Sequence, residues 1–395
     1  MVKKININEL EVNGFKTFGK AQIDLDNVTY IVAKNGQGKS TLLNAITWAI
    51  MGLDMYGNRM DPFQIGGPLT SWVKLDAVCD GNPTIVRRII QMKAKGKTET
   101  TITNKIGDDI DKELFYSMVN PRYVQSLDPK GIKNVIAKAM KMPVSIMEAA
   151  IDASLVSAAN AYAGADSYDK IIAVEDGIKT ITAEIKNIEK EILVSQGKIA
   201  AVESIKAIFE ANGIEANEEV EETLAMTVDG AVSVMSVKEM EIAKKKEDSK
   251  LLSAYRTAAY ESLATEFNNS MKHVQIKLNE NGKEVFIVTY DGKNVRACSN
   301  SEQLLAGLEI INALAEATDM EYPVLVDNAE CILNIDVKDY PNIKQFVFAI
   351  VADENLSIWD GTHLIDIENG TLMPRSREQL IPSVKLLDGW GAKAK

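Results

Sequence analysis

The apolar and polar positions up to about residue 110 predict strands around a single helix. Apolar and polar residues alternate, as in half-buried strands, on both sides of a turn at Gly14 to Gly19. A glycine-rich turn follows, and the pattern changes to that of an amphipathic helix ending near Gly52. Three more strand-like segments, separated by Asp80-Gly81 and Gly96, predict an antiparallel meander. These patterns cover residues 6–15, 21–32, 40–52, 71–81, 83–93 and 98–107.

The middle of the chain has the pattern of long helices. From about residue 111 it is helical and polar, and from residue 170 its isoleucines follow the narrow seam of a coiled coil, at Ile178, Ile181, Ile185, Ile188 and Ile192. An acidic stretch, 210–222, interrupts this pattern before a second helical stretch at about 231–272. We expect an antiparallel helical hairpin with the acidic stretch at its tip and arms of about 40 to 60 Å, at 1.5 Å per residue. A plain packed helical domain is the alternative.

Strands return after the hairpin. A segment at 274–295 contains two hairpin turns, Asn281-Gly282 and Asp291-Gly292, and a helix is predicted at about 301–317. Two apolar runs, 322–328 and 345–352, read as further strands. The pattern therefore predicts an α/β layer that is interrupted by helices and then resumed, so its two halves must meet in space. The expected domains are 1–165, 166–272 and 273–395.

Composition adds limits rather than a function. The chain is 46% apolar and 25% charged, as in ordinary globular proteins, and it contains no run of about 18 apolar residues of the kind that spans a membrane. We expect no membrane partner and no secretory signal. Three widely spaced cysteines, Cys79, Cys298 and Cys331, fit a reducing cytoplasm rather than a disulfide framework. The net charge of −12 argues against indiscriminate nucleic-acid binding but leaves room for a local basic groove.

The stretch "AKNGQGKST", Ala33 to Thr41, lies between a predicted strand and a predicted helix. This is the context of a phosphate-binding loop, in which backbone N–H groups and the helix N-terminus bind the phosphates. Lys39 would bridge the β- and γ-phosphates of ATP, and the Ser40 hydroxyl would bind Mg²⁺. The alternative is a surface glycine turn. The residues assigned to the nucleotide are Asn35, Gly36, Gln37, Gly38, Lys39, Ser40 and Thr41.

A second acidic feature follows a buried strand, in "VLVDNAEC", residues 324–331. Asp327 is positioned as the carboxylate that holds Mg²⁺ in a nucleotide-hydrolysing site. Such sites place a glutamate next, but this chain has Asn328, which can orient a water molecule but cannot accept its proton. An extended chain would point Glu330 to a different face from Asp327, whereas a turn after Asp327 would return it towards the γ-phosphate. We therefore assign Glu330 as the catalytic base, with a slow or inactive ATPase as the alternative.

The phosphate-binding loop and the residues around it resemble a known family of ATPases. "NGFKTF", followed by "IDL" and "YIVAKNGQGKSTLLNAITWAIMG", resembles the N-terminal head segment of the SMC/RecF/SbcC group of ABC-type ATPases. In that group an antiparallel coiled coil separates the two halves of one ATPase head, which is the order of motifs in this chain. The resemblance covers about residues 4–52 and 285–356. It implies an ABC-type P-loop ATPase head formed from both ends of the chain, using ATP and Mg²⁺.

The resemblance also implies roles for residues outside the loop. "ACSNSEQLLAGLEIINALAE" is similar to the signature motif without its glycines, so Ser299 and Ser301 would bind the ATP of a second copy in a head-to-head dimer. From the residues alone, Ser299 and Glu302 form a capping box that begins a helix. Gln125 stands where the family has a glutamine that contacts Mg²⁺ and the attacking water. Lys16 and Thr17 occupy positions that approach the nucleotide, although Lys16 is equally interpreted as an exposed turn residue.

Two features depart from the family pattern. The switch histidine has no counterpart after 345–352, where Asp353 is the candidate substitute. The coiled coil is short and has no cysteines at its tip, which favours a compact, clamp-like machine of the kind found in phage or mobile-element systems.

Relatives in this group mostly act on DNA, often with a separate nuclease subunit. Two lysine- and arginine-rich stretches, 86–97 and 128–141, are the candidate DNA surface, with a solvated face as the alternative. Three hypotheses remain: an ATPase for DNA recombination, repair or nuclease control, a nucleotide-gated clamp with little turnover, and an ATPase of a defence system that acts on a protein.

Overall fold

The first sheet confirms the predicted meander. The computed structural model of the chain describes residues 2–278, 286–332, 335–351, 357–359, 363–368, 371–373 and 385–387. Within them, an antiparallel sheet has the order β2-β1-β4-β5-β6. Asp80 and Gly81, with φ of 48° and 81°, form the tight turn between β4 and β5. Its strands are β1 (Ile5–Phe15), β2 (Phe18–Asp24), β4 (Thr70–Cys79), β5 (Asn82–Met92) and β6 (Thr98–Thr103).

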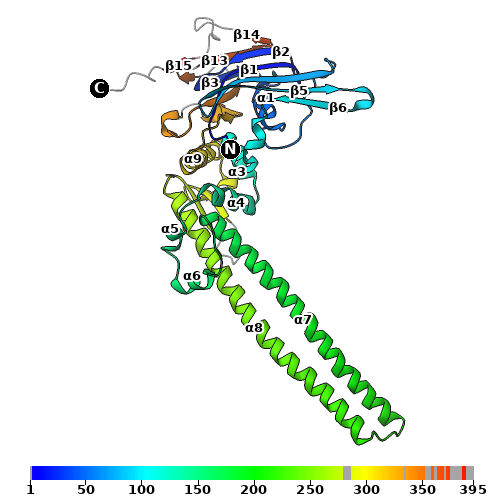
Figure 1. The fold of residues 1–395 in the computed structure, drawn as a ribbon. Coiled ribbons are helices and arrows are strands. Elements are labelled where there is room, and N and C mark those ends of the chain that lie inside the picture. The colour runs from blue at the N-terminus through cyan, green and yellow to red at the C-terminus, as the bar shows by residue number, and fades with distance from the viewer. Residues whose placement is uncertain are drawn as a thin grey trace. The chain divides into compact units, whose positions relative to one another are not determined.

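The second sheet joins the two ends of the chain. Its order is β10-β11-β3-β13-β14, and β3 pairs in parallel with β11 on one side and β13 on the other. Strand β3 comes before the hairpin and its neighbours come after it, so the prediction that the two halves meet in one α/β layer is confirmed (Figure 1). The strands are β3 (Val28–Ala33), β10 (Val324–Val326), β11 (Phe346–Val351), β13 (His363–Glu368) and β14 (Thr371–Met373).

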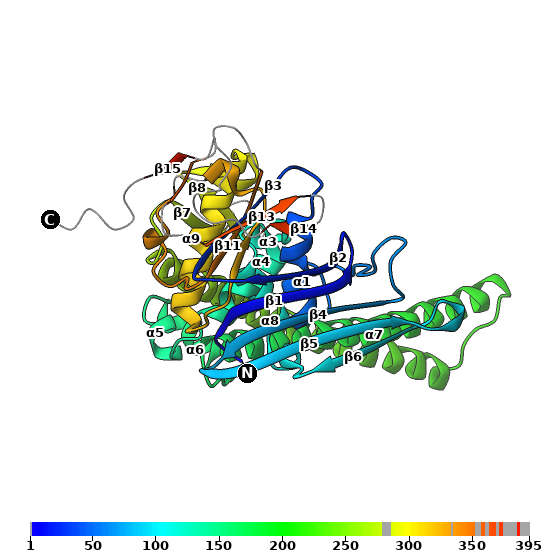
Figure 2. The ribbon, with the colours of Figure 1, turned by 90° about the horizontal axis from the view of Figure 1, so that it is seen from above.

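Helix α1 (Lys39–Met51) contacts strands of both sheets, namely β3 and β11 on one side and β4 and β5 on the other. Figure 2 shows α1 against the strands of the first sheet. It is apolar around most of its circumference, which is the pattern of a helix buried between two layers. The guanidinium of the buried Arg88 donates hydrogen bonds to the carbonyl oxygens of Ala49 and Ile50, 3.2 Å each, and so caps the C-terminus of α1.

One buried side chain links the two sheets. Gln345, 2% exposed, lies just before β11. Its side-chain amide forms hydrogen bonds with both the N–H and the carbonyl group of Ile7 in β1. Its Oε1 accepts from the Ile7 N–H at 2.9 Å, and its Nε2 donates to the Ile7 carbonyl at 2.7 Å. The same Nε2 lies 3.3 Å from the carbonyl oxygen of Asp26. Strand register in the first sheet is therefore tied to the strands that return after the hairpin.

Short helices and two small sheets, one of β7, β8 and β9 and one of β12 and β15, complete this part of the chain as far as the structure describes it. A core cluster centred on Tyr30, Leu308, Val326 and Phe348 packs α9 against the second sheet. The hairpin turn at Asp291-Gly292 is confirmed, whereas Asn281-Gly282 and Asp353 lie outside the described residues. The elements are α2 (Lys112–Val119), α3 (Tyr123–Ser126), α4 (Pro129–Ala139), β7 (Val274–Leu278), β8 (Phe286–Tyr290), β9 (Lys293–Asn294), α9 (Asn300–Thr318), β12 (Ser357–Trp359) and β15 (Lys385–Leu387).

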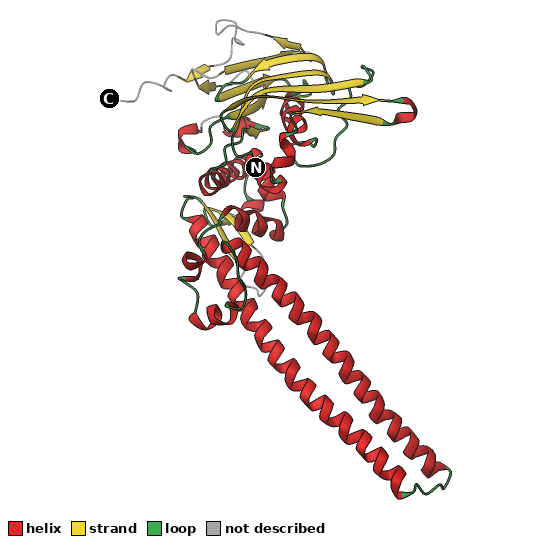
Figure 3. Cartoon of the chain, in the orientation of Figure 1, coloured by secondary structure: helices red, strands yellow, loops and turns green. Residues whose placement is uncertain are grey.

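The predicted helical hairpin is present and is longer than expected (Figures 1 and 3). Helix α7 (Ser167–Ala211) has 45 residues and α8 (Glu218–Asn268) has 51, or about 68 and 77 Å at 1.5 Å per residue. Helix α8 begins well before the predicted residue 231. The side chain of Asn217 accepts from the N–H of Val220 at 2.9 Å, and acidic residues in the first turn favour the helix N-terminus.

The coiled-coil seam is confirmed and extends beyond the predicted isoleucines. Positions at three- and four-residue steps from Val174 to Val202 are buried or half-buried along α7. Two ion pairs join the helices, Glu191 to Lys238 at 3.0 Å and Glu184 to Lys245 at 2.8 Å. The second pair lies seven residues earlier in α7 and seven residues later in α8 than the first pair, as expected for two antiparallel helices.

The chain divides into two compact units, residues 1–140 with 264–395, and residues 141–263. The compact helical unit spans residues 141–263, and the expected domain boundaries at 166 and 272 stay a prediction. Helices α5 (Val144–Glu148) and α6 (Ala153–Ala159) belong to it. The Ser262 hydroxyl donates to the carbonyl of Met147 at 3.0 Å, and Tyr255 donates to Glu148 at 2.5 Å, which fixes α5 on α8. No helix in the described part of the chain combines the length and apolarity needed to cross a bilayer.

We predict that Gln345→Ala lowers the free energy of unfolding by about 3 kcal/mol, because it leaves the N–H and C=O of Ile7 buried without partners. Urea denaturation of the full chain measures the change. The matched control is Gln275→Ala on β7, where the side chain is exposed and a change below about 0.5 kcal/mol is expected. Equal effects of the two substitutions would show that Gln345 does not link the sheets.

Candidate functional site

The phosphate-binding loop has the predicted strand–turn–helix geometry. Strand β3 ends at Ala33, and α1 begins at Lys39 after a left-handed Gly38 with φ of 104°. No side chain caps the N-terminus of α1, so its first backbone N–H groups remain available to an anion. A Cβ on Gly38 would lie 2.6 Å from the Thr17 hydroxyl oxygen and 2.8 Å from the Phe18 ring, so only glycine fits there. A Cβ on Gly36 would meet nothing within 4 Å, which leaves that side of the loop open.

Lys39 is buried at the base of this loop, with 7% of its surface exposed. Its ammonium donates to the carbonyl oxygens of Ala33 at 3.0 Å and Lys34 at 3.2 Å. Burial lowers the pKa of Lys39, while the negative charges of Glu330 and then Asp327 act in the opposite direction. Both predicted carboxylates of the C-terminal half therefore lie within electrostatic range of the loop lysine.

The position of Glu330 follows from a turn at Asn328. Strand β10 delivers Asp327, whose carboxylate accepts from the N–H of Asn328 at 3.1 Å. Asn328 has φ of 55°, a left-handed conformation that asparagine tolerates better than most residues. The chain then enters a short 3₁₀ helix, Ala329–Ile332, in which Ala329 and Ile332 are buried. Glu330 is consequently exposed on the other side, and this is the turn that its predicted role as the catalytic base requires.

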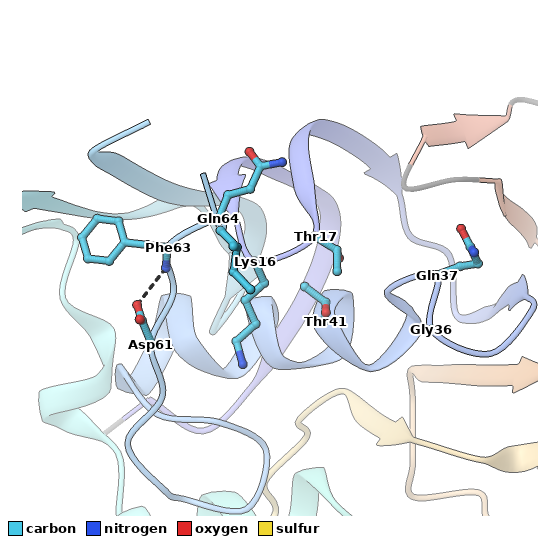
Figure 4. A pocket seen from close by; sticks show the side chains of 9 residues that line it. Lys16, Thr17, Gly36, Gln37, Thr41, Asp61, Phe63 and Gln64 are labelled. Atoms are coloured by element: carbon cyan, nitrogen blue, oxygen red, sulfur yellow. Dashed lines mark hydrogen bonds between the residues drawn. The ribbon is translucent and has the colours of Figure 1, made fainter. Parts of the chain in front are cut away.

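The turn between β1 and β2 packs on the phosphate-binding loop, and the approach of Lys16 and Thr17 to the nucleotide stays a prediction. Lys16 has φ of 51°, and its N–H donates to the carbonyl of Pro62 at 3.0 Å. A cavity of about 650 Å³ lies here, within the size range of small-molecule sites. Figure 4 shows the side chains around it. The residues that line it are Lys16, Thr17, Gly36, Gln37, Thr41, Asp61, Phe63, Gln64 and Ile65.

Four of these lining residues, Asp61, Phe63, Gln64 and Ile65, were not predicted from the sequence. The Asp61 carboxylate accepts from the N–H of Phe63 at 3.1 Å, and the N–H of Gln64 donates to the carbonyl of Gly14 at 3.1 Å. Ile65 is fully exposed at 100%. The available signal was an apolar pair, Phe63 and Ile65, within a Pro- and Gly-containing loop, since such residues are normally buried or contact a ligand.

The hydrogen bonds of the Gln125 side chain go to residues outside the phosphate-binding loop. Its amide nitrogen donates to the carbonyl of Gln303 in the first turn of α9 and is 3.4 Å from the carbonyl of Pro121. It also lines a cavity of about 100 Å³ with Ile132 and Val288. The predicted contact of Gln125 with Mg²⁺ stays a prediction. In the structure, its amide joins α3 to α9.

Arg122, three residues before Gln125, is a further candidate that the sequence reasoning missed. Its buried Nε has no hydrogen-bond acceptor among the described residues. Burial and then the charge of Asp327 raise the pKa of Tyr56, and the charge of Arg122 opposes this rise. Burial and then the charge of Glu330 raise the pKa of Cys331, and Arg122 opposes this rise as well. Arg122 is therefore close to the acidic turn that carries the predicted base.

The predicted capping box at the start of α9 is complete. The N–H of Ser299 donates to Glu302 at 2.7 Å, and the Ser299 hydroxyl oxygen accepts from the N–H of Glu302 at 3.4 Å. The Ser299 N–H and then the Ser299 hydroxyl, at 2.8 Å, donate hydrogen bonds to the Glu302 carboxylate and lower its pKa. The hydroxyls of Ser299 and Ser301 lie 3.1 Å apart. Their predicted contact with the ATP of a second copy stays a prediction.

Several basic residues of the candidate DNA surface have structural partners. Arg88 caps α1, as described above, and Arg87 stacks on the ring of Trp72 at 4.5 Å. Lys138 pairs with Asp111 at 3.1 Å and Glu113 at 2.7 Å. Lys93 and Lys141 also form ion pairs, with Glu99 and Asp166. Lys97 and Lys130 remain exposed, so the basic surface is smaller than the sequence predicts.

Comparison with known proteins identifies the family. The family described as an AAA domain matches residues 9–318, which is most of the chain. The chain belongs to this AAA domain family. Its P-loop, the inserted hairpin and the joined second sheet have the arrangement that the resemblance to the SMC/RecF/SbcC group implies.

Individual relatives of this AAA domain protein are distant. The chromosome partition protein Smc of Fusobacterium nucleatum is 44% identical over 54 residues, which are 13% of this chain and 4% of that protein. The Smc head domain of Pyrococcus furiosus with an extended coiled coil, solved with the C-terminal domain of ScpA, is 16% identical, with 95% of this chain and 97% of that chain covered and a TM-score of 0.45. The recombination mediator RecF with ATP is 12% identical, with coverage of 95% and 99% and a TM-score of 0.41.

We predict that Gly38→Ala destabilises the protein by about 2 to 4 kcal/mol, because the new methyl group adds a clash with Thr17 and Phe18 to the cost of a left-handed alanine. Thermal and urea unfolding measure the change. Gly81→Ala is the matched control, since Gly81 has φ of 81° and open space around it, and should cost about 1 kcal/mol. If the two substitutions cost the same, the packing of the β1–β2 turn on the loop is not as described.

Proposed function

We propose that this chain binds and hydrolyses ATP, dimerises head to head around ATP and acts on DNA in recombination, repair or nuclease control. The observation that carries the proposal is the approach of Glu330 and Asp327, from the C-terminal half, to Lys39 in the loop of the N-terminal half. A phosphate-binding loop alone binds nucleotide, whereas a carboxylate facing its lysine supplies a base for hydrolysis.

In this proposal the triphosphate occupies the open side of the loop. The first N–H groups of α1 and the ammonium of Lys39 bind the phosphates, and Lys39 exchanges its present carbonyl acceptors for phosphate oxygens. The base and ribose of ATP occupy the adjacent cavity, against Phe63 and Ile65. Apolar walls with a few polar groups are typical of such sites.

Glu330 then accepts the proton of the attacking water, while the oxygen of that water forms the new bond to the γ-phosphorus and ADP leaves with the old bridging oxygen. The residues offered to Mg²⁺ are oxygen donors, the Ser40 hydroxyl and the Asp327 carboxylate, which suit this ion. Gln125 would join them after releasing the Gln303 carbonyl. Bound Mg²⁺ neutralises charge on the phosphates.

The second copy of the chain would complete the site with Ser299 and Ser301, at the N-terminus of α9 that carries the capping box. Dimerisation in this way would make ATP a clamp that hydrolysis opens. Exposed lysines on the head, among them Lys97 and Lys130, would contact DNA. A separate nuclease subunit is the proposed partner for cleavage chemistry.

A nucleotide-gated clamp with little turnover is the second candidate. Asn328, in place of the glutamate that usually follows the aspartate, is the observation that favours it. A third, an ATPase that serves a defence system through a protein partner, would show turnover that is independent of DNA.

We predict that Glu330→Gln reduces the rate of ATP hydrolysis by at least about 100-fold, because the amide cannot accept a proton. ATP binding, measured with a fluorescent ATP analogue, should change little. Asn328→Gly keeps the left-handed turn and removes the side chain, so it should retain hydrolysis within a few-fold of wild type.

The control for Glu330→Gln is Glu316→Gln, an exposed acid on α9 far along the helix from its N-terminus. Wild-type turnover in Glu330→Gln would exclude Glu330 as the base. Absence of turnover in the wild-type protein, with ATP still bound, would favour the clamp.

We also predict that double-stranded DNA stimulates hydrolysis and that Lys97→Glu with Lys130→Glu weakens this stimulation several-fold. The effect should fall as salt is raised from about 50 to about 200 mM, because binding releases counterions from DNA phosphates. The matched control is Lys344→Glu, an exposed lysine outside both basic stretches. A rate unchanged by DNA, with no DNA binding at low salt, would point to a protein partner instead.

A further inference from the structure

The tip of the helical hairpin contains a groove that the ATPase proposal does not use. Its volume is about 770 Å³, which is within the range of ligand-binding clefts. We call it the tip groove. It is lined by five apolar residues, Phe209, Ile214, Ala216, Leu224 and Ala225, and by four charged residues, Lys206, Glu210, Glu215 and Glu221.

The local backbone explains how an apolar side chain is held in the tip groove. Helix α7 ends at Ala211 and is followed by Asn212 and by Gly213, which is in the left-handed conformation at φ of 65°. The N–H of Ile214 donates to the carbonyl of Phe209 at 2.9 Å, and that of Gly213 to the carbonyl of Glu210 at 3.2 Å, the two bonds of a Schellman motif. This motif brings Ile214 back towards Phe209, and yet Ile214 remains 53% exposed.

Two further apolar side chains near the tip are exposed without any role in this turn. Ile208 is 57% exposed and Met226 is 65% exposed. They lie on the last turns of α7 and the first turns of α8, on either side of the connecting loop. An apolar surface at the end of a hairpin, where water surrounds it, is costly unless another molecule covers it.

The tip is also strongly acidic. Residues 203–229 contain eight acidic residues and a single lysine, a net formal charge of −7 out of −12 for the whole chain. Within the described residues, none of the three glutamates of the tip groove forms an ion pair. Glu221 lies in the first turn of α8, where an acid favours the helix. Glu210, however, lies in the last turn of α7, where the helix dipole disfavours it, and Glu215 is in the loop.

We propose that the tip groove binds a basic segment of another protein, which inserts an apolar side chain against Phe209, Ile214 and Leu224. Lysine or arginine residues on both sides of that anchor would face Glu210, Glu215 and Glu221. The negative charge of the tip favours a basic segment over other occupants. A nucleic acid and the tip of a second copy of this chain are both negative and would be repelled, whereas a basic apolar peptide complements both features of the groove.

The test uses the full chain and a fluorescein-labelled peptide composed of leucine and lysine at helical spacing, with a leucine and glutamate peptide of the same pattern as its counterpart. Fluorescence anisotropy should show saturable binding of the lysine peptide, without ATP, and none of the glutamate peptide. Ile214→Ala keeps the turn and should weaken binding about tenfold, as for a buried anchor residue.

The charge contribution is tested with Glu210→Gln, Glu215→Gln and Glu221→Gln combined, which should weaken binding about tenfold or more and reduce its salt dependence. The matched control neutralises the same number of exposed acids elsewhere on the hairpin, Glu189→Gln, Glu239→Gln and Glu247→Gln, and should retain most of the affinity. Far-ultraviolet circular dichroism checks that each variant keeps its helices.

Three results would overturn the proposal. The first is equal binding of the lysine peptide by wild type, by Ile214→Ala and by the tip triple variant. The second is no binding of the lysine peptide, or equal binding of the glutamate peptide. The third is wild-type self-association in sedimentation velocity that Ile214→Ala abolishes, since this would make a second copy the occupant.

Discussion

The parallel pairing of β3 with β11 and β13 is the constraint on which the rest of the head depends. Strand β3 positions the phosphate-binding loop, and β10, on the far side of β11, positions Asp327. Gln345, just before β11, forms hydrogen bonds with Ile7 in the first sheet. Because these neighbours come from opposite ends of the chain, the loop and its carboxylates can meet only after the hairpin has returned the chain. Such non-local pairing costs loop-closure entropy, which the contacts it makes must offset.

The hairpin resolves part of that difficulty, because an antiparallel pair returns the chain to its starting point whatever the length of its arms. Its register is set by polar groups at the seam as well as by isoleucines. Lys238 and Lys245 occupy half-buried seam positions and pair with Glu191 and Glu184. Exposed ion pairs contribute little stability, but polar groups at core positions disfavour other registers. The arms thus combine an apolar seam with a specified alignment, and they carry the tip groove at their far end.

What could be predicted from the sequence was local. The loop at Ala33–Thr41, the capping box of Ser299 and the isoleucine seam each depend on residues a few positions apart, and each has the predicted geometry. The misses involve partners distant in sequence. We interpreted Arg88 as part of a DNA surface, but its side chain reaches from β5 to the C-terminus of α1 and caps it. The loop around Phe63 and Ile65 had no regular period, and only its tertiary position shows that it lines the cavity. The start of α8 was missed because acidic residues were interpreted as an interruption rather than as a favourable first turn.

The central claim is that Glu330 and Lys39 act on one phosphate, although a long hairpin separates them in the chain. A crystal structure of the Glu330→Gln protein with ATP and Mg²⁺ tests it most directly. We expect the γ-phosphate against Lys39 and the first turn of α1, with the side chain at position 330 in hydrogen-bonding reach, directly or through one water. A nucleotide bound in the cavity while the side chain at position 330 points away from the γ-phosphate would contradict the account.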